Sequence, residues 1–202
     1  MINIEEVYKI NGHLTIHKVD AQGETLIFDD HNIIVSGMGY GLGYLFSKLG
    51  SQRITDFQLT RFQLGISGST GREVSSTYDL SVPLSSISEY VGNSGDLTIF
   101  SAIQLKNGSN VTSPVPYFAK IPFNKITRIN ENSVRYTLVI DQESCNNLTR
   151  AGNNVNLNEI GLFMQNPKGS ANEASVLAAY KHFSDIRKTS DFALVFRWTI
   201  QF

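Results

Sequence analysis

The sequence predicts a mainly β fold, an antiparallel sandwich or barrel-like core that carries one principal α-helix and long loops. The first observation is strict alternation in the last segment of the chain. One face of that segment collects the large apolar side chains Phe192, Leu194, Phe196, Trp198, Ile200 and Phe202. Such period-two alternation marks a half-buried strand against a large core. The second observation is composition, because only 17% of the residues are charged, against about 25% in typical soluble domains. Asn, Ser, Thr and Gly take their place, as in loop-rich β proteins.

Residues 1–202 are expected to form a single structural domain that begins with an N-terminal hairpin over residues 1–31. The stretches HLTIHKV and ETLIFDD both alternate apolar and polar residues. Between them lies DAQG, with Asp20 and Gly23 in turn-forming places. Two alternating runs around such a turn are the usual signature of a β-hairpin.

The principal helix is expected over residues 32–50. Its apolar side chains recur at the spacing of a helix, at Ile34, Met38, Leu42 and Leu45. Asp30 or Asn32 is expected to cap the start of this helix, and Gly50 its end.

Residues 55–202 are expected to form the β core, with long loops at 66–96 and 106–118. The strand candidates in this region are FQLTRFQLG, LTIFSAIQL, KITRI, SVRYTLVIDQ, NEIGLFMQ and VLAAYKHF. The first loop is long and poor in regular pattern, which is typical of an interaction loop. The second loop is rich in proline, which excludes pairing as a central strand.

Charge and cysteine content exclude several classes of function. A net charge of −1 predicts no nucleic-acid partner, because phosphate backbones are bound by clustered Lys and Arg. The single cysteine, Cys145, excludes a disulfide framework within the chain and a cysteine-cluster metal site. The opening MINIEEVYKING has acidic residues where a secretion signal needs positive charge, and no segment reaches the roughly 18 apolar residues of a membrane span. We therefore expect synthesis in the cytoplasm and no membrane partner.

The glycine-rich stretch GMGYGLG, residues 37–43, has three interpretations. A dinucleotide-binding loop needs Gly-x-Gly-x-x-Gly, but the third glycine of that spacing is missing whichever glycine begins it. A membrane-inserting segment over residues 33–46 would be short for a span and would lack the basic face of interfacial helices. The favoured interpretation is a smooth helix face that lets a strand or a neighbouring subunit approach closely. Replacing Gly41 with Leu should then disturb packing or assembly.

Two polar clusters contain the residue types of metal sites. Asp29, Asp30 and His31 are adjacent, and adjacent residues of a strand point to opposite faces, so all three cannot converge on one ion. His13 and His17 share a strand face but lie about 13 Å apart by the usual rise per residue. No metal ligand is therefore expected.

The residue types of a nucleophilic enzyme are present without the arrangement that such enzymes need. His182, Ser184 and Asp185 are the types of a hydrolase triad, but the chain has no strained Gly-x-Ser-x-Gly elbow. Ser67 lies in GISG, one residue short of that motif. Cys145 has no base that the sequence places beside it. We expect no catalytic residue, no cofactor and no enzymatic activity.

Several blocks of the chain resemble a broad group of tailed-bacteriophage virion proteins. An Asn-Glu-Ile-Gly-Leu-Phe strand, an Ala-rich strand, a Phe-Ser-Pro-Ile-x-Lys-Thr turn and a terminal strand with Trp follow one another in that group. Here they correspond to Asn158 to Phe163, Leu177 to Tyr180, Phe183 to Thr189 and Leu194 to Phe202. An Asn-x-Ile/Val-Val-x-x-Gly entry into a helix corresponds to Asn32 to Gly37, and LGISGSTG is a weaker counterpart of a glycine turn. Asp stands at position 185, where the group usually has Pro.

The resemblance implies a non-enzymatic structural component of a virion, associated with the tail, baseplate or fibre base. Its partners would be other phage virion proteins and further copies of itself. A capsid decoration or collar protein and a host-surface carbohydrate-binding module are the alternatives. The residues expected at assembly interfaces are Gly37, Gly41, Tyr78, Tyr90, Tyr117 and Phe118. In a carbohydrate-binding module, the three tyrosines and Phe118 would instead stack against sugar rings.

Overall fold

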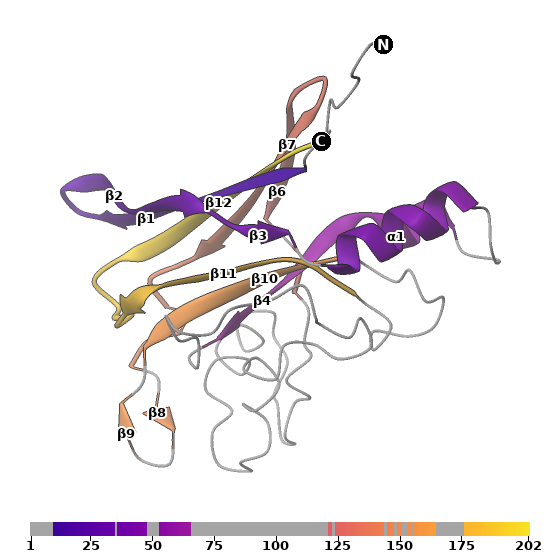
Figure 1. Ribbon diagram of the computed structural model, residues 1–202. Coiled ribbons are helices and arrows are strands. Elements are labelled where there is room, and N and C mark those ends of the chain that lie inside the picture. The colour runs from indigo at the N-terminus through magenta and orange to yellow at the C-terminus, as the bar shows by residue number, and fades with distance from the viewer. Residues whose placement is uncertain are drawn as a thin grey trace, which may run out of the picture.

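The computed structural model forms a sandwich of two antiparallel five-stranded sheets that face each other without closing into a barrel (Figure 1). The predicted β fold with one principal helix is thereby confirmed, in its sandwich form. The structure describes residues 10–34, 36–47, 53–65, 121–122, 124–143, 145–147, 149–150, 153–154, 156–164 and 176–202. The predicted loops at 66–96 and 106–118, and the predicted strand LTIFSAIQL, lie outside these residues.

The first sheet has the order β2-β1-β12-β7-β6 and the second has the order β3-β11-β10-β4-β5. The strands of the first sheet are β1 (Asn11–Asp20), β2 (Gly23–His31), β6 (Lys125–Asn130), β7 (Ser133–Ile140) and β12 (Ala193–Gln201). The strands of the second are β3 (Ile33–Ile34), β4 (Leu59–Gly65), β5 (Ile121–Pro122), β10 (Leu157–Met164) and β11 (Val176–Ile186). A small ladder joins β8 (Thr149–Arg150) to β9 (Asn153–Asn154), and the helices are α1 (Ser36–Ser47) and the 3₁₀ turn η1 (Ile54–Phe57).

Strand β12 is the central strand of the first sheet, and its alternation is confirmed. It pairs with β1 on one side and with β7 on the other. Its inward side chains have no exposed surface and form the middle of the core, at Leu194, Phe196, Trp198 and Ile200. The ends of the predicted face differ, because Phe192 is half-buried and Phe202 is 44% exposed. The apolar face of this strand therefore extends beyond the core at Phe202.

Strands β1 and β2 form a hairpin within the predicted residues 1–31, and it is an integral part of the first sheet; residues 1–9 lie outside the described residues. In the turn, the Asp20 carboxylate accepts the Gln22 backbone N–H at 2.9 Å. Gly23 has φ +122°, a conformation that side-chain-bearing residues rarely adopt. Strand β1 pairs with β12 along its whole length, so the hairpin adds two strands to the edge of the main core.

Strand β10 is the central strand of the second sheet and is buried along its whole length. Ile160, Leu162 and Met164 belong to the core cluster. Glu159 is fully buried as well, and one of its carboxylate oxygens accepts the Tyr180 hydroxyl at 2.8 Å. Gly65 of β4 lies opposite Glu159 in the ladder, and the carboxylate fills the volume that a side chain at position 65 would take.

The helix is shorter than predicted, and neither predicted residue caps its start. Ile33 and Ile34 form β3 and pair with β11, so α1 begins at Ser36. The Asn32 side chain instead accepts the indole N–H of Trp198 at 2.7 Å. The Asp30 carboxylate accepts a hydrogen bond from the Lys181 ammonium at 2.6 Å and so links the first sheet to the second. Both polar side chains are used in tertiary contacts rather than at the helix end; Gly50 lies outside the described residues.

The glycines of α1 lie on two different faces of the helix, one buried and one exposed. Gly37 and Gly41 are buried, and a methyl group on Gly41 would overlap the sulfur of Met164 on β10. Gly39 and Gly43 are exposed, and a methyl group on either would meet nothing within 4 Å. Close packing of the helix on a strand is thus achieved within this chain, at Gly41.

We predict opposite effects for Gly41→Ala and Gly43→Ala on the free energy of unfolding. Gly43→Ala should raise it by about 0.5–1 kcal/mol, because alanine favours the helix and meets no neighbour. Gly41→Ala should lower it by about 1–3 kcal/mol, because the methyl group must displace a buried methionine. Urea denaturation of both variants measures the difference. Equal effects at the two positions would contradict the close contact with Met164.

We also predict that Asn32 and Trp198 are energetically coupled. Asn32→Ala and Trp198→Phe should each cost about 1–3 kcal/mol or more, since each leaves a buried polar group of its partner unpaired. The double variant should cost less than the sum of the two, with a coupling energy of about 1 kcal/mol, measured by urea denaturation of the four proteins. The cycle cancels the loss of ring packing in Trp198→Phe. Additive losses would show that the hydrogen bond contributes nothing.

Candidate functional site

The most distinctive surface feature of the described residues is an apolar pocket between α1 and the ends of the two sheets. Its volume is about 390 Å³. The side chains that line it carry no charge and come from both sheets, both helices and the segment after β12: Met38, Leu42, Leu45, Phe57, Gln58, Leu59, Thr60, Ile126, Tyr136, Met164 and Phe202.

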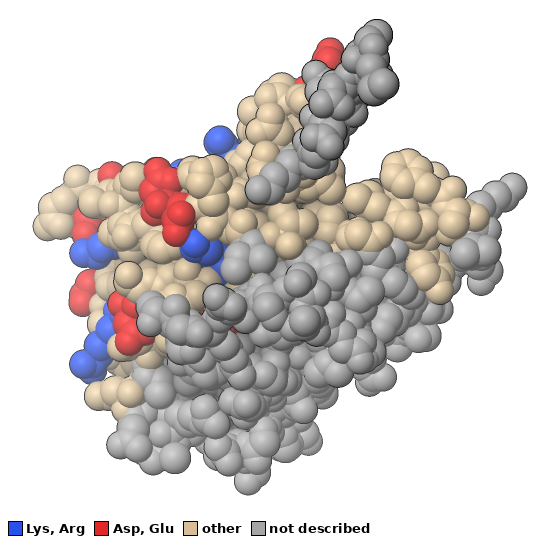
Figure 2. All heavy atoms as spheres, in the orientation of Figure 1, with Lys and Arg blue, Asp and Glu red and all other residues tan. Residues whose placement is uncertain are grey.

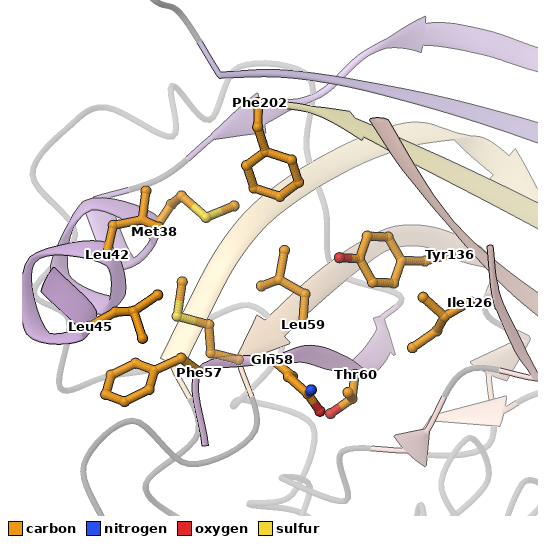
Figure 3. Close-up of a pocket in the computed structure, with 11 residues that line it drawn as sticks. Met38, Leu42, Leu45, Phe57, Gln58, Leu59, Thr60, Ile126, Tyr136 and Phe202 are labelled. Carbon is orange, nitrogen blue, oxygen red and sulfur yellow. The ribbon is translucent and has the colours of Figure 1, made fainter. Parts of the chain in front are cut away.

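The walls of the pocket are set by the helix on one side and the first sheet on the other (Figure 3). Met38, Leu42 and Leu45 lie on α1 at helical spacing, so a single face of α1 forms one wall. Tyr136 and Ile126 come from neighbouring strands β7 and β6 and form the opposite wall. The Tyr136 hydroxyl points into the pocket (Figure 3), and burial raises its pKa, so the phenol stays neutral. The pocket is therefore suited to an apolar group and not to an ion.

Exposed apolar side chains occur in the elements that line this pocket. The exposed fraction is 81% for Phe46 and 76% for Ile54, and it is also high for three lining residues, Leu45, Ile126 and Phe202. Phe46 lies one turn after Leu42 on α1, and Ile54 lies three residues before Phe57 on η1. Residues at these spacings share a helix face, so both extend the apolar lining outward. We call Leu45, Phe46, Ile54, Ile126 and Phe202 the apolar rim.

Charged side chains gather elsewhere on the molecule. In Figure 2 most of the acidic and basic side chains of the described residues lie towards the end that carries the β1–β2 turn, whereas the part of α1 seen in this view carries none. At the charged end Glu24 of β2 forms ion pairs with Arg197 and with His17. Helix α1 has no charged residue in any turn. The molecule thus has one polar end and one apolar end, and the pocket lies at the apolar end.

The histidines of the first sheet form a polar cluster that sequence reasoning missed. His13 of β1 pairs directly with His31 of β2, and their rings lie 5.3 Å apart, centroid to centroid. The His13 ring nitrogen lies 2.5 Å from the Asp29 carboxylate. The signal was present in the sequence, because Asp29 and His31 are two residues apart and share a strand face. Only Asp30 points away, towards Lys181.

This cluster does not become a metal site. Among the described residues, no group of three His, Cys, Asp or Glu side chains could hold a metal ion. His17, the other histidine of this face, is paired with Glu24 at 2.9 Å. Its partial burial, together with the neighbouring Arg197 charge, lowers the pKa of His17. The cluster is a network of exposed ion pairs, which contribute little stability individually.

The triad residue types on β11 do not come together. His182 and Ser184 are two residues apart on β11, whereas Asp185 directly follows Ser184 and its carboxylate binds two asparagine side chains. The Asp185 carboxylate accepts hydrogen bonds from Asn158 at 3.1 Å and Asn156 at 3.5 Å. These contacts attach the end of β11 to the start of β10. The carboxylate holds two strands together where the resembling proteins have proline.

Cys145 and Lys188 are buried next to each other in the core. Burial raises the pKa of the Cys145 thiol to about 12, although the neighbouring Lys188 acts in the opposite direction. Burial lowers the pKa of Lys188, and its ammonium group donates to Asn146 at 2.8 Å and to the Thr189 carbonyl at 2.6 Å. Lys188 also lies 5.2 Å from the centre of the Phe192 ring. The lysine anchors the turn before β12, and the thiol is protonated and enclosed.

None of the residues predicted for assembly contacts belongs to the apolar rim. Gly37 and Gly41 are buried within the chain, so the exposed glycines of α1 are Gly39 and Gly43. Tyr78, Tyr90, Tyr117 and Phe118 lie outside the described residues. The pocket itself was not predicted, because its lining joins residues that are far apart in sequence.

No family model, curated protein or solved structure matches the chain. The described part of the chain contains no helix with the length and apolar content of a membrane span. The candidate site is therefore defined by its own geometry: an uncharged pocket, an apolar rim and a charged region at the far end.

We predict that Cys145 resists alkylation in the folded protein. A thiol with a pKa near 12 has almost no thiolate at pH 8, and the side chain has no exposed surface. Iodoacetamide should label the native protein at least about 100-fold more slowly than the protein in urea, since the thiolate is the reactive form. Mass spectrometry of timed samples gives both rates. Rapid labelling of the native protein would contradict the described burial.

Proposed function

We propose that this chain is a non-enzymatic structural subunit of a tailed-phage virion that assembles through the apolar face around α1. The observation that carries the proposal is the concentration of exposed apolar side chains at the end of the molecule that carries α1. Five of the nine large apolar side chains that are exposed in the described residues form the apolar rim. The largest apolar patch on a protein surface is often functional, and exposed patches of several hundred Å² mark interaction sites.

The virion context comes from the resemblance of the sequence blocks, and the structure supports treating those blocks as one unit. The helix-entry block contains Asn32, and the terminal block contains Trp198. Their side chains share a hydrogen bond of 2.7 Å. Lys188 of the turn block is buried, and its ammonium group binds the Thr189 carbonyl and Asn146. The resembling residues thus include those that fix the core and its connections, which suits a structural subunit with a well-packed core.

The position in the particle is proposed to be the tail, baseplate or fibre base, with capsid decoration or a collar as the alternative structural role. These roles share one physical requirement, a stable contact with neighbouring protein surfaces. An uncharged apolar face meets it, because such a contact does not depend on ion pairs that salt screens.

Purified particles test the proposal. Particles from cells that produce this chain are sedimented through a density gradient at high salt and analysed by mass spectrometry. The chain should sediment with the particles at a constant ratio to their other proteins. Recovery of the chain only in the unsedimented fraction would overturn the proposal. Binding of the isolated chain to host cells or glycans, with no association with particles, would favour a carbohydrate-binding module.

A further inference from the structure

We propose that the occupant of the apolar pocket is a second copy of this chain, and that each copy inserts Phe46 into the pocket of the other about a two-fold axis. This inference rests on the proposed function as an assembly subunit and names its first partner. Its parts are a projecting aromatic side chain, an adjacent uncharged pocket and a rim without like-charge repulsion.

Phe46 is the projecting group. It is 81% exposed, more than any other large apolar side chain in the described residues. It lies one helical turn after Leu42, which lines the pocket, so it leaves α1 on the pocket side. Exposed aromatic side chains beside a pocket are the usual anchors of protein interfaces, where they contribute most of the binding energy.

The pocket can receive an aromatic ring. Its volume is about 390 Å³, and a cavity of about 150 Å³ with apolar walls is known to hold benzene. None of its lining side chains is charged. The Tyr136 hydroxyl and the polar side chains of Gln58 and Thr60 are the polar groups of the lining. A phenyl ring therefore matches the mostly apolar lining better than a polar or charged group would.

The apolar rim supplies the area that a stable pair needs. At roughly 200 Å² for a fully exposed large side chain, the exposed fractions of its five members amount to about 570 Å² of apolar surface per copy. A standard interface buries about 800 Å² per partner, of which a little more than half is apolar. The rim therefore has the apolar area of a standard interface.

The location of both parts on one face determines the symmetry. A head-to-tail ring or filament requires the projecting group and the pocket on different faces, whereas a two-fold pair requires both on the same face. In the proposed pair Phe46 and the pocket belong to one face, because Leu42, one turn before Phe46 on α1, lines the pocket. Charge permits the pairing, since α1 has none and Ile54 is flanked by one residue of each sign, Arg53 and Asp56.

The oligomeric state of the purified full chain is the first test, measured by sedimentation velocity over a range of concentrations. The wild-type chain should form a dimer. Phe46→Ser should weaken the dimer by at least about 100-fold in Kd, because two aromatic anchors are lost per pair. The matched control is Leu26→Ser, which removes an apolar side chain that is 49% exposed on β2, at the charged end. This control should dimerise as the wild type does.

A mixing experiment distinguishes insertion into the pocket from a general loss of apolar surface. Gln58→Trp places a bulky side chain at an exposed position of the pocket lining and should also prevent dimerisation. An equal mixture of Phe46→Ser and Gln58→Trp should form mixed dimers, because Phe46 of one copy still meets an open pocket in the other. Both variants should retain the circular dichroism and melting behaviour of the wild type.

Each other outcome overturns the proposal. A wild-type chain that stays monomeric, a Phe46→Ser variant that still dimerises, or a mixture that stays monomeric would each contradict the pairing. A wild-type assembly larger than a dimer would contradict the two-fold symmetry, and an apolar small molecule retained in native mass spectrometry would show a different occupant. A monomeric chain that is still found in particles would remove this inference and leave the proposed function. A chain that dimerises but is absent from particles would remove the proposed function and leave the pairing.

Discussion

The hydrogen bond between Trp198 and Asn32 is the interaction on which the arrangement of both sheets depends. Trp198 is the largest fully buried side chain of the described core and lies on the central strand β12. Asn32 lies where the chain leaves β2 of the first sheet and enters β3 of the second. Its backbone N–H also donates to the Gly12 carbonyl at 2.9 Å, and its side chain fills the space beside that glycine. One amide thus fixes β1, β12 and the crossing to the second sheet, and with them the start of α1.

The position of α1 in turn creates the apolar end of the molecule. Gly41 lets the helix approach β10 until it contacts Met164, and the next turn then faces the ends of β6 and β7 across the pocket. The two sheets are also linked by the ion pair between Asp30, near the end of β2, and Lys181 of β11. Helix α1 has no charged residue, packs closely on its own chain at Gly41 and leaves its last turn exposed. It can therefore contact its own core on one side and a second protein on the other.

Local patterns in the sequence were sufficient to predict the strands of six or more residues, because each of them carries its own apolar pattern, whereas the two-residue strands β3, β5, β8 and β9 were not predicted. The terminal strand, the β1–β2 hairpin and the strands β6 and β7 follow from neighbouring residues and were predicted correctly. Asn32 was misassigned as a helix cap, since the residue type fits both a cap and a tertiary hydrogen bond and only the distant Trp198 decides between them. The two-residue strand β3 was missed for a similar reason, because Ile33 and Ile34 continue the helical apolar spacing. The pocket joins side chains from position 38 to position 202, and no local pattern contains that information.

The central claim is that the face of α1 and η1 is the assembly surface, and hydrogen–deuterium exchange measured at low and at high protein concentration tests it most directly. Amides of the last turn of α1 and of η1 should exchange more slowly at high concentration, while those of β2 at the charged end should exchange at the same rate. Protection of β2 with no change in α1 and η1, or exchange that is independent of concentration throughout, would contradict the claim.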